Sequence, residues 1–118
     1  MKNVTQLISK MEKDEQIVVR RLEEWAELRG DKLFFYYGED NLKKTYYEFN
    51  SLANMLAHHL KKLGVEKGER VSVFMKNSYI CTLSMFAIWK AGGVFAPINF
   101  NYKGKTLSYL INDTNPLI

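Results

Sequence analysis

The chain has 118 residues, room for about one domain, and 47% of them are apolar and 25% charged. These proportions are ordinary for a globular protein and exclude an intrinsically disordered chain. Seventeen Lys and Arg against thirteen Asp and Glu give a net charge of +4, without the clustered basic residues of a nucleic-acid-binding protein. The sequence therefore predicts a folded domain with no nucleic-acid partner.

Cysteine content and hydropathy indicate the cellular location of the protein. The single cysteine, Cys81, excludes an intramolecular disulfide and any metal site built from several cysteines. One cysteine fits a reducing compartment, and residues 1–6 lack the apolar run of a secretory signal. The most apolar stretch, residues 79–89, is much shorter than the roughly twenty residues that span a bilayer. We therefore predict a cytoplasmic protein without a membrane span.

The first predicted element is a helix over residues 14–29. Its apolar side chains, from Val18 to Leu28, recur three and four positions apart, with charged side chains between them. Gly30 ends the helix, and the apolar residues between positions 4 and 11 could add a helical turn or two. We assign residues 1–30 to an N-terminal helical segment.

A β-hairpin is predicted next. Residues 32–37 are mostly aromatic and are bounded by turn sequences, which is typical of a strand. The turn Gly38-Glu39-Asp40-Asn41 then leads into a second short strand over residues 42–44.

The clearest helix begins after Thr45. Thr45 and Glu48 have the spacing of a capping box, in which each side chain binds the backbone amide of the other residue. A sustained apolar spacing follows, and the helix ends at Lys61-Lys62-Leu63-Gly64, with cations in its last turn and glycine just after it. Residues 70–75 then alternate in polarity and predict a strand.

The rest of the chain reads as strand, helix, strand and helix. Asn77 or Ser78 caps a helix to about Lys90 that is apolar nearly all round. Gly92-Gly93 ends it, and a strand follows over residues 94–98, then a helix to about Asp113 and the opening of another strand at 115–118. This alternation predicts a mainly parallel sheet with helices packed on it, in an incomplete α/β subdomain over residues 31–118.

Gly104-Lys105-Thr106 is the local motif that most resembles a known binding motif. A phosphate-binding loop ends in Gly-Lys-Ser/Thr, follows a strand and opens a helix. The full pattern also needs a glycine five residues earlier, where this chain has Asn99. A polar turn is the other interpretation, and a small phosphate-binding protein stays open as an alternative.

The remaining candidates form no complete site. His58 and His59 are adjacent on a predicted helix, so they point about 100° apart and cannot both bind one metal. Cys81 lies in an apolar helix, where a thiol packs as a small hydrophobic group. The aromatic residues at 34–37 and 46–49 could stack on bases but lack interleaved basic residues, which favours core packing. We therefore assign no catalytic, cofactor-binding or metal-binding residue.

Four blocks of sequence carry a family likeness, and they are Thr45-Tyr46-Tyr47-Glu48-Phe49, then Gly64-Val65-Glu66-Lys67-Gly68-Glu69-Arg70-Val71, then Lys76-Asn77-Ser78, then Trp89-Lys90-Ala91-Gly92-Gly93-Val94-Phe95-Ala96-Pro97-Ile98-Asn99. In this order and spacing, the chain resembles the amino-terminal part of the adenylate-forming (AMP-binding) enzymes: acyl-CoA synthetases, nonribosomal adenylation domains and luciferases. The likeness covers nearly everything from Trp25 to Ile118. Asn99 favours an acid–CoA ligase, since amino-acid-activating members usually carry aspartate there.

The resemblance implies a fold and a reaction for a longer parent protein. The fold is the N-terminal subdomain of the adenylate-forming enzymes. In the reaction, a carboxylate attacks the α-phosphate of ATP with magnesium present, and CoA then displaces AMP from the acyl-adenylate. The family's phosphate loop, magnesium-binding Thr-Glu, ribose-binding aspartate and C-terminal lysine have no counterpart in these 118 residues. The implied cofactors ATP, magnesium and CoA therefore belong to the parent, and the fragment itself is predicted to be inactive.

The implied partner of the fragment is the remainder of the parent chain. Without it, the apolar helix over residues 79–90 should leave an exposed apolar surface and cause self-association. A non-catalytic α/β interaction module is the alternative hypothesis. Fatty acids and carnitine-like or crotonobetaine-like acids are both compatible substrates.

Overall fold

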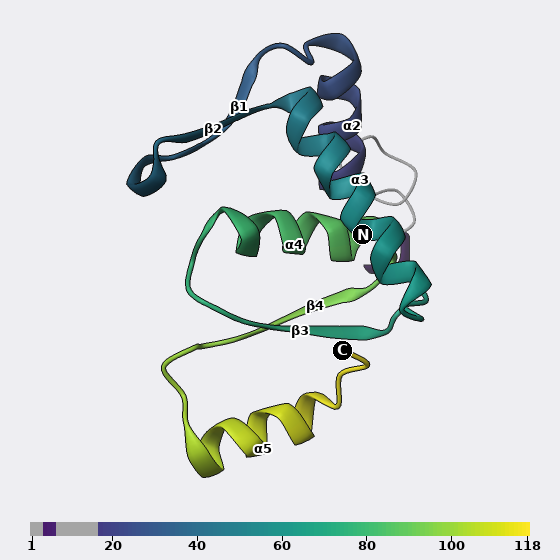
Figure 1. Ribbon diagram of the computed structural model, residues 1–118. Helices are drawn as coiled ribbons and strands as arrows, with labels where there is room; N and C mark the ends of the chain where they lie inside the picture. The colour runs from purple at the N-terminus through teal and green to yellow at the C-terminus, as the bar shows by residue number, and fades with distance from the viewer. Residues whose placement is uncertain (1–3, 7–16) are drawn as a thin grey trace.

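The computed structural model describes residues 4–6 and 17–118. Its elements follow the predicted order (Figure 1) and are α2 (Val18–Leu28), β1 (Leu33–Tyr37), the 3₁₀ turn η1 (Gly38–Asp40), β2 (Leu42–Thr45), α3 (Tyr46–Lys62), β3 (Arg70–Phe74), α4 (Tyr79–Lys90), β4 (Val94–Ile98) and α5 (Gly104–Thr114). The predicted start of the first helix at Asp14 lies outside the described residues. Elsewhere the predicted bounds differ from the observed ones by a residue or two.

The hairpin forms a two-stranded antiparallel sheet of its own. β1 and β2 pair from Leu33 opposite Thr45 to Tyr37 opposite Leu42, with one irregularity between Leu33 and Phe35. Asn41 closes the turn in the left-handed region, at φ 48°, a conformation that asparagine tolerates better than most residues.

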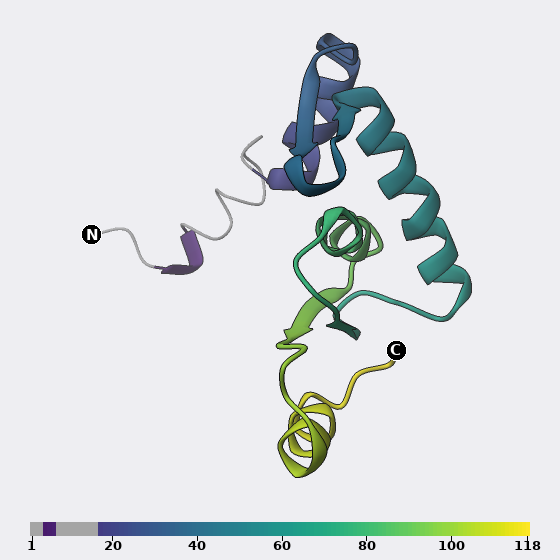
Figure 2. The same ribbon diagram turned by 60° about the vertical axis from the view of Figure 1, so that its left-hand side comes forward.

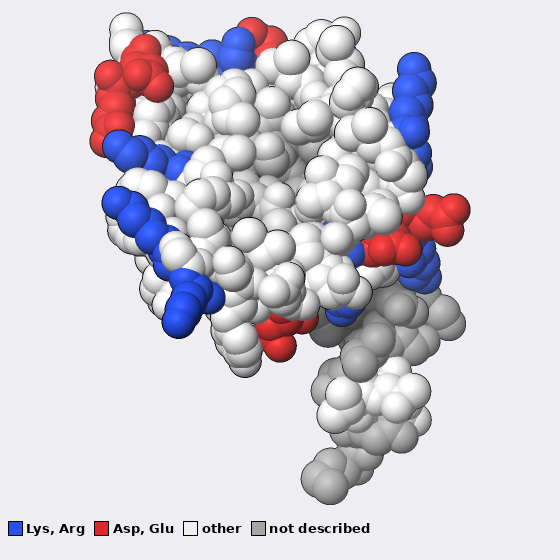
Figure 3. All heavy atoms as spheres, turned by 60° about the horizontal axis from the view of Figure 1, so that its bottom comes forward, with Lys and Arg blue, Asp and Glu red and all other residues white. Residues whose placement is uncertain are grey.

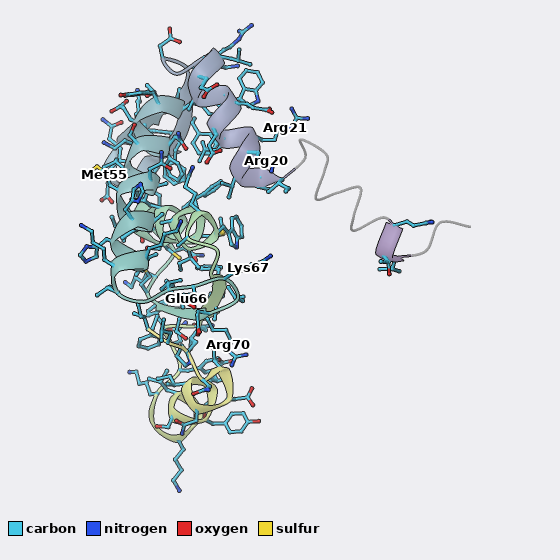
Figure 4. The ribbon with its side chains drawn as sticks, turned by 90° about the vertical axis from the view of Figure 1, so that its right-hand side faces the viewer. Arg20, Arg21, Met55, Glu66, Lys67 and Arg70 are labelled. Atoms are coloured by element: carbon cyan, nitrogen blue, oxygen red, sulfur yellow. The ribbon has the colours of Figure 1, made fainter. Side chains whose placement is uncertain are left out.

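The capping box predicted for α3 is confirmed. Thr45 Oγ1 accepts from the Glu48 amide at 3.1 Å, and Glu48 Oε1 accepts from the Thr45 amide at 3.2 Å. After the cap, Phe49 and Ala53 of α3 face the core and are buried. Met55 projects from the outer face of the helix (Figure 4), with 68% of its surface exposed. The helix is therefore amphipathic, as its spacing predicts.

β3, α4 and β4 form the predicted parallel unit. Arg70 pairs with Val94 at one end and Phe74 with Ile98 at the other, and α4 is the crossover between the strands. The chain leaves α4 through Gly92, whose φ is +85°. A Cβ on Gly93 would lie 3.0 Å from Ile88 Cγ2 and 3.2 Å from the Glu69 carbonyl oxygen, so the tight return into β4 favours glycine there. The parallel sheet thus has two regular strands, beside the separate antiparallel hairpin.

α4 is the centre of the molecule. It lies between α3 on one side and the β3–β4 sheet on another (Figures 1 and 2), with the hairpin and α2 above it. Five of its residues are buried: Tyr79, Leu83, Phe86, Ala87 and Ile88. The sequence predicts that this helix lacks cover, but the fold covers most of it and leaves Ile80 and Trp89 as its exposed large apolar residues.

Most aromatic residues of the hairpin and of α3 pack in or against the core, as predicted, whereas Tyr36 and Tyr47 are exposed. Phe49 is completely buried, and its ring lies edge-on to Phe34 at 4.9 Å and to Phe86 at 5.3 Å between centroids. Edge-to-face rings at these distances attract one another beyond simple area burial. This aromatic cluster joins the hairpin, α3 and α4.

The C-terminal part of the described chain lies under the sheet (Figure 1). α5 has no buried residue. After it, the Leu117 amide donates to the Arg70 carbonyl and the Ile118 carbonyl accepts from the Ser72 amide, both at 2.8 Å. Residues 115–118 form no regular strand, but these two bonds place their end beside β3, where a strand opening is predicted. No helix in the described part of the chain is long and apolar enough to cross a membrane.

Candidate functional site

A cavity opens at the carboxyl ends of β3 and β4. It has a volume of about 370 Å³ and is lined by Val73, Met75, Asn77, Cys81, Pro97, Ile98, Asn99, Phe100 and Asn101. In α/β proteins, ligands usually bind outside the carboxyl ends of the parallel strands. This cavity is therefore the candidate site that the fold itself indicates.

Three asparagines come to the cavity directly after the two strands. Asn77 follows β3, and Asn99 and Asn101 follow β4. Asn99 Oδ1 accepts from the Asn101 amide at 3.0 Å, which fixes the turn leaving β4. Side-chain amides both donate and accept hydrogen bonds, so this part of the wall can bind neutral polar groups.

The hairpin reaches the same site through Tyr37. The Tyr37 hydroxyl lies 3.2 Å from the Asn77 carbonyl oxygen and 2.9 Å from Glu39 Oε2. The hydrogen bond to the Glu39 carboxylate raises the pKa of Tyr37 above its ordinary value of 10.0. The hydroxyl has a single proton, which the Glu39 carboxylate within the hairpin and the Asn77 carbonyl of the β3–α4 turn share as acceptors.

Cys81 lies in the first turn of α4 and lines the cavity. Ser78 caps that turn, with its Oγ accepting from the Cys81 amide at 3.1 Å, which confirms one of the two predicted caps. The side chain of Cys81 is half-buried and also packs against the core cluster around Ile88. Cys81 is thus a hydrophobic core neighbour, as predicted, and also part of the cavity wall.

A cation stands near the rim. Lys76 Nζ lies 5.6 Å from the centroid of the Phe100 ring, within the range of a cation–π contact. Phe100 in turn lines the cavity. The surroundings of the cavity are therefore amide-rich and apolar, with one ammonium group held beside them.

The motif residues singled out in the sequence lie elsewhere. Gly104, Lys105 and Thr106 open α5, are exposed, and do not line this cavity. His58 and His59 are exposed on α3. Within the described residues, no three His, Cys, Asp or Glu side chains lie together in a group that could hold a metal ion.

Sequence reasoning assigned no site here and so missed the grouping of Asn77, Cys81, Asn99 and Asn101. In the sequence, Asn77 is identified as a helix cap and as part of a family block, and Asn99 as a family marker and as the residue in place of a phosphate-loop glycine, but neither as a cavity residue. The signal that could have found them is positional. Each asparagine lies within three residues of the end of a predicted parallel strand, and such ends share one edge of a sheet.

Comparison with known proteins decides the family. The AMP-binding enzyme family matches residues 22–117, which includes the hairpin, the parallel unit and α5. The chain belongs to this family. The fold class predicted from the sequence, a partial N-terminal subdomain of the adenylate-forming fold, is confirmed by solved structures of such enzymes.

Relatives come from both the peptide-synthetase and the CoA-ligase branches. Tyrocidine synthase 2 from Brevibacillus parabrevis is 30% identical over 104 residues, 88% of this chain and 3% of that protein. The medium/long-chain-fatty-acid–CoA/3-oxocholest-4-en-26-oate–CoA ligase of Mycobacterium marinum is 34% identical over 85 residues, 72% of this chain and 15% of that ligase. The fatty acyl CoA synthetase structure from Mycobacterium tuberculosis superposes with a TM-score of 0.75 at 28% identity, over 80% of this chain and 19% of that one. The chain thus spans less than a fifth of the length of each.

Proposed function

We propose that this chain is the amino-terminal part of an ATP-dependent acid–CoA ligase. Asn99 is the observation that carries the choice of ligase within the AMP-binding family, because amino-acid-activating members usually have aspartate after Pro-Ile. The similarity to a fatty-acid–CoA ligase and to a fatty acyl CoA synthetase supports the same choice. The reaction joins a carboxylic acid to CoA by way of an acyl-adenylate, with AMP and pyrophosphate released.

In this proposal the described residues have a structural role and do not themselves take part in the reaction. Their buried groups are aromatic and aliphatic side chains that hold α2, the hairpin and α3 against α4. We assign the binding of ATP, magnesium and CoA to the rest of the ligase. Magnesium and cationic groups there would stabilise the negative charge that develops on the α-phosphate. The 118-residue chain alone is accordingly inactive.

A fatty acid is the proposed substrate class, with carnitine-like acids as the second choice. The first is the acid named in the relatives' own descriptions. We also propose a cytoplasmic location, which the single cysteine supports because it requires no oxidising compartment.

The test begins with the length of the native product. An antibody raised against these residues should detect, in the cell of origin, a band several times heavier than 13.8 kDa. That protein, once purified, should exchange labelled pyrophosphate into ATP with fatty acids and not with amino acids. Exchange with amino acids alone, or a native band at 13.8 kDa, would overturn the ligase proposal.

The two other hypotheses predict different results. A phosphate-binding protein would lose nucleotide binding on the substitution Lys105→Ala, whereas the ligase and interaction-module hypotheses predict no change for the 118-residue chain. An interaction module would be a native 13.8-kDa product that captures a partner. The Lys105→Ala measurement therefore separates phosphate binding from both other interpretations.

A further inference from the structure

A groove lies between the first turn of α2 and the last turn of α4. Its volume is about 510 Å³, within the range of about 300–1,000 Å³ that is usual for the binding sites of small organic molecules. Val18 and Val19 line it from α2, and Trp89 and Lys90 line it from α4. The groove shares no lining residue with the cavity at the ends of β3 and β4. It is therefore a second candidate site, on another part of the described fold.

Most of the groove wall is apolar and open to solvent. Ile17, directly before α2, is 39% exposed, Val18 is 53% exposed and Trp89 is 38% exposed. Exposed apolar side chains that gather in one hollow usually mark a place where another molecule binds. An alkyl chain lying against them would remove apolar surface from water on both sides, which stabilises the bound state. The wall therefore favours a ligand with an apolar chain.

The groove also holds a nearly buried cation. The side chain of Lys90 is only 4% exposed, and its Nζ donates to Glu23 Oε1 at 2.8 Å. An ammonium group has three donors, and among the described residues Glu23 is the one acceptor that Lys90 reaches. A nearly buried charge gains more from each hydrogen-bond partner than an exposed one does. Lys90 therefore has donors to offer to a ligand in the groove.

The start of α2 adds to the positive character of the groove. No side chain caps this helix at Ile17, and its first turn contains no acidic residue. A helix start of this kind attracts anions, because it carries free amides and the positive end of the helix dipole. Arg20 lines the groove at the same end of α2 (Figure 4). Glu23 is the one acidic side chain among the described residues that line the groove, so Lys90 and Arg20 leave a net positive charge there.

A neighbouring aromatic cavity lacks this combination. Its volume is about 240 Å³, and its lining includes Trp25 of α2 and Tyr46 of α3. Its cation is Arg21, which is 49% exposed and already bonded to Glu24 within the same helix. An exposed charge of this kind is well solvated and contributes little to binding. The groove beside Lys90 is therefore the stronger candidate for an anion that carries an apolar chain.

We propose that the groove between α2 and α4 binds an alkyl carboxylate of medium chain length. Its carboxylate accepts a hydrogen bond from Lys90 Nζ and lies near Arg20 and the free amides at the start of α2. Its alkyl chain lies against Val18 and Trp89. The inference goes beyond the proposed function, because this binding requires neither ATP nor CoA and involves no step of the ligase reaction.

The experiment uses the two tryptophans of the chain as reporters. The 118-residue chain, labelled with ¹⁵N, is titrated with decanoate, and the indole N–H signals are followed by NMR. The Trp89 signal should shift and reach saturation, whereas the signal of Trp25, which lines the aromatic cavity, should stay in place. Decyltrimethylammonium has the same alkyl chain and the opposite charge, so it should shift neither signal. No shift of Trp89 with decanoate, equal shifts with both amphiphiles, or a shift of Trp25 alone would overturn the proposal.

Three variants test the role of the ion pair. Lys90→Met removes the ammonium group, keeps an unbranched side chain and should weaken decanoate binding about tenfold or more. Glu23→Gln removes the competing carboxylate and should strengthen binding a few-fold, and decanoate should then raise its melting temperature more than that of the wild type. Glu24→Gln, on the same helix but outside the groove, should bind decanoate as the wild type does. Unchanged affinity in both Lys90→Met and Glu23→Gln would contradict the proposal, whatever pyrophosphate exchange shows about the ligase.

Discussion

At the scale of the residue, Thr45 and Glu48 decide where α3 begins. Each side chain satisfies a backbone amide of the other residue that the helix cannot pair by itself. The hydrogen bond from the Thr45 amide lowers the pKa of the Glu48 carboxyl below its ordinary value of 4.5, and the Thr45 side chain and Lys44 act in the same direction. The ionised form of Glu48 is therefore the one that the fold stabilises.

The first prediction concerns the pH dependence of this cap. Because the pKa of Glu48 is lowered in the folded state, its contribution is fully present above pH 4.5 and is lost as the pH falls through the lowered value. The wild-type melting temperature should therefore fall more steeply below about pH 4.5 than that of Glu48→Gln, as followed by circular dichroism. Parallel curves for the two proteins would show that Glu48 does not carry this dependence.

Thr45→Ala measures the other half of the capping box. It should reduce the free energy of unfolding by about 1 kcal/mol at neutral pH, as loss of a threonine cap usually does.

At the scale of the element, the packing of α4 is the central feature. Its sequence is apolar on nearly every side. In the fold, α3, the hairpin and α2 cover some of these sides and the β3–β4 sheet covers another (Figure 2). Its last residue also makes a polar link to α2. Lys90 Nζ lies 2.8 Å from Glu23 Oε1, with the lysine side chain only 4% exposed and the glutamate 49% exposed.

The second prediction is that this link fixes α2 against α4. Glu23→Gln would leave the ammonium group of Lys90 nearly buried without a counter-charge, so the free energy of unfolding should fall by about 1–2 kcal/mol, between the values for exposed and fully buried pairs. The exposed pair of Arg21 and Glu24 on the same helix gives the control. Glu24→Gln should change stability by less than about 0.5 kcal/mol. Equal effects in urea unfolding would contradict the prediction.

At the scale of the whole molecule, the chain is looser than a self-contained domain. Its radius of gyration is 16.3 Å, against about 13.5 Å expected for a compact domain of this length. Residues 4–6 stand apart from the body (Figure 2). The face that carries α5 is largely uncharged, with Lys and Arg toward its margins (Figure 3). On α5, Leu107 and Leu110 are only half-buried and Ile111 is 41% exposed.

The third prediction is that the isolated 118-residue chain self-associates through this uncovered α5 surface. Light scattering should show oligomers that grow with concentration, and an apolar dye should fluoresce on binding. Ile111→Lys should reduce both signals, whereas Met55→Lys, on the outer face of α3, should leave them unchanged. A monomer that does not bind dye at high concentration would contradict the prediction.

The sequence by itself determined the order and nearly the bounds of the elements, because their signals are local. The cap at Thr45, the glycines at 92 and 93 and the apolar spacing of α3 act within a few residues of one another. It also indicated the family, since four blocks of residues recur in a fixed order. Only the tertiary structure shows that α4 is covered and that α5 has no buried residue, because burial depends on which helix and sheet faces pack against each other. It likewise brought Asn77, Cys81 and Asn99 to one cavity. Asn99 is distant in the chain from Asn77 and Cys81, and only the parallel pairing of β3 with β4 places the ends of both strands, and the start of α4, at the same edge.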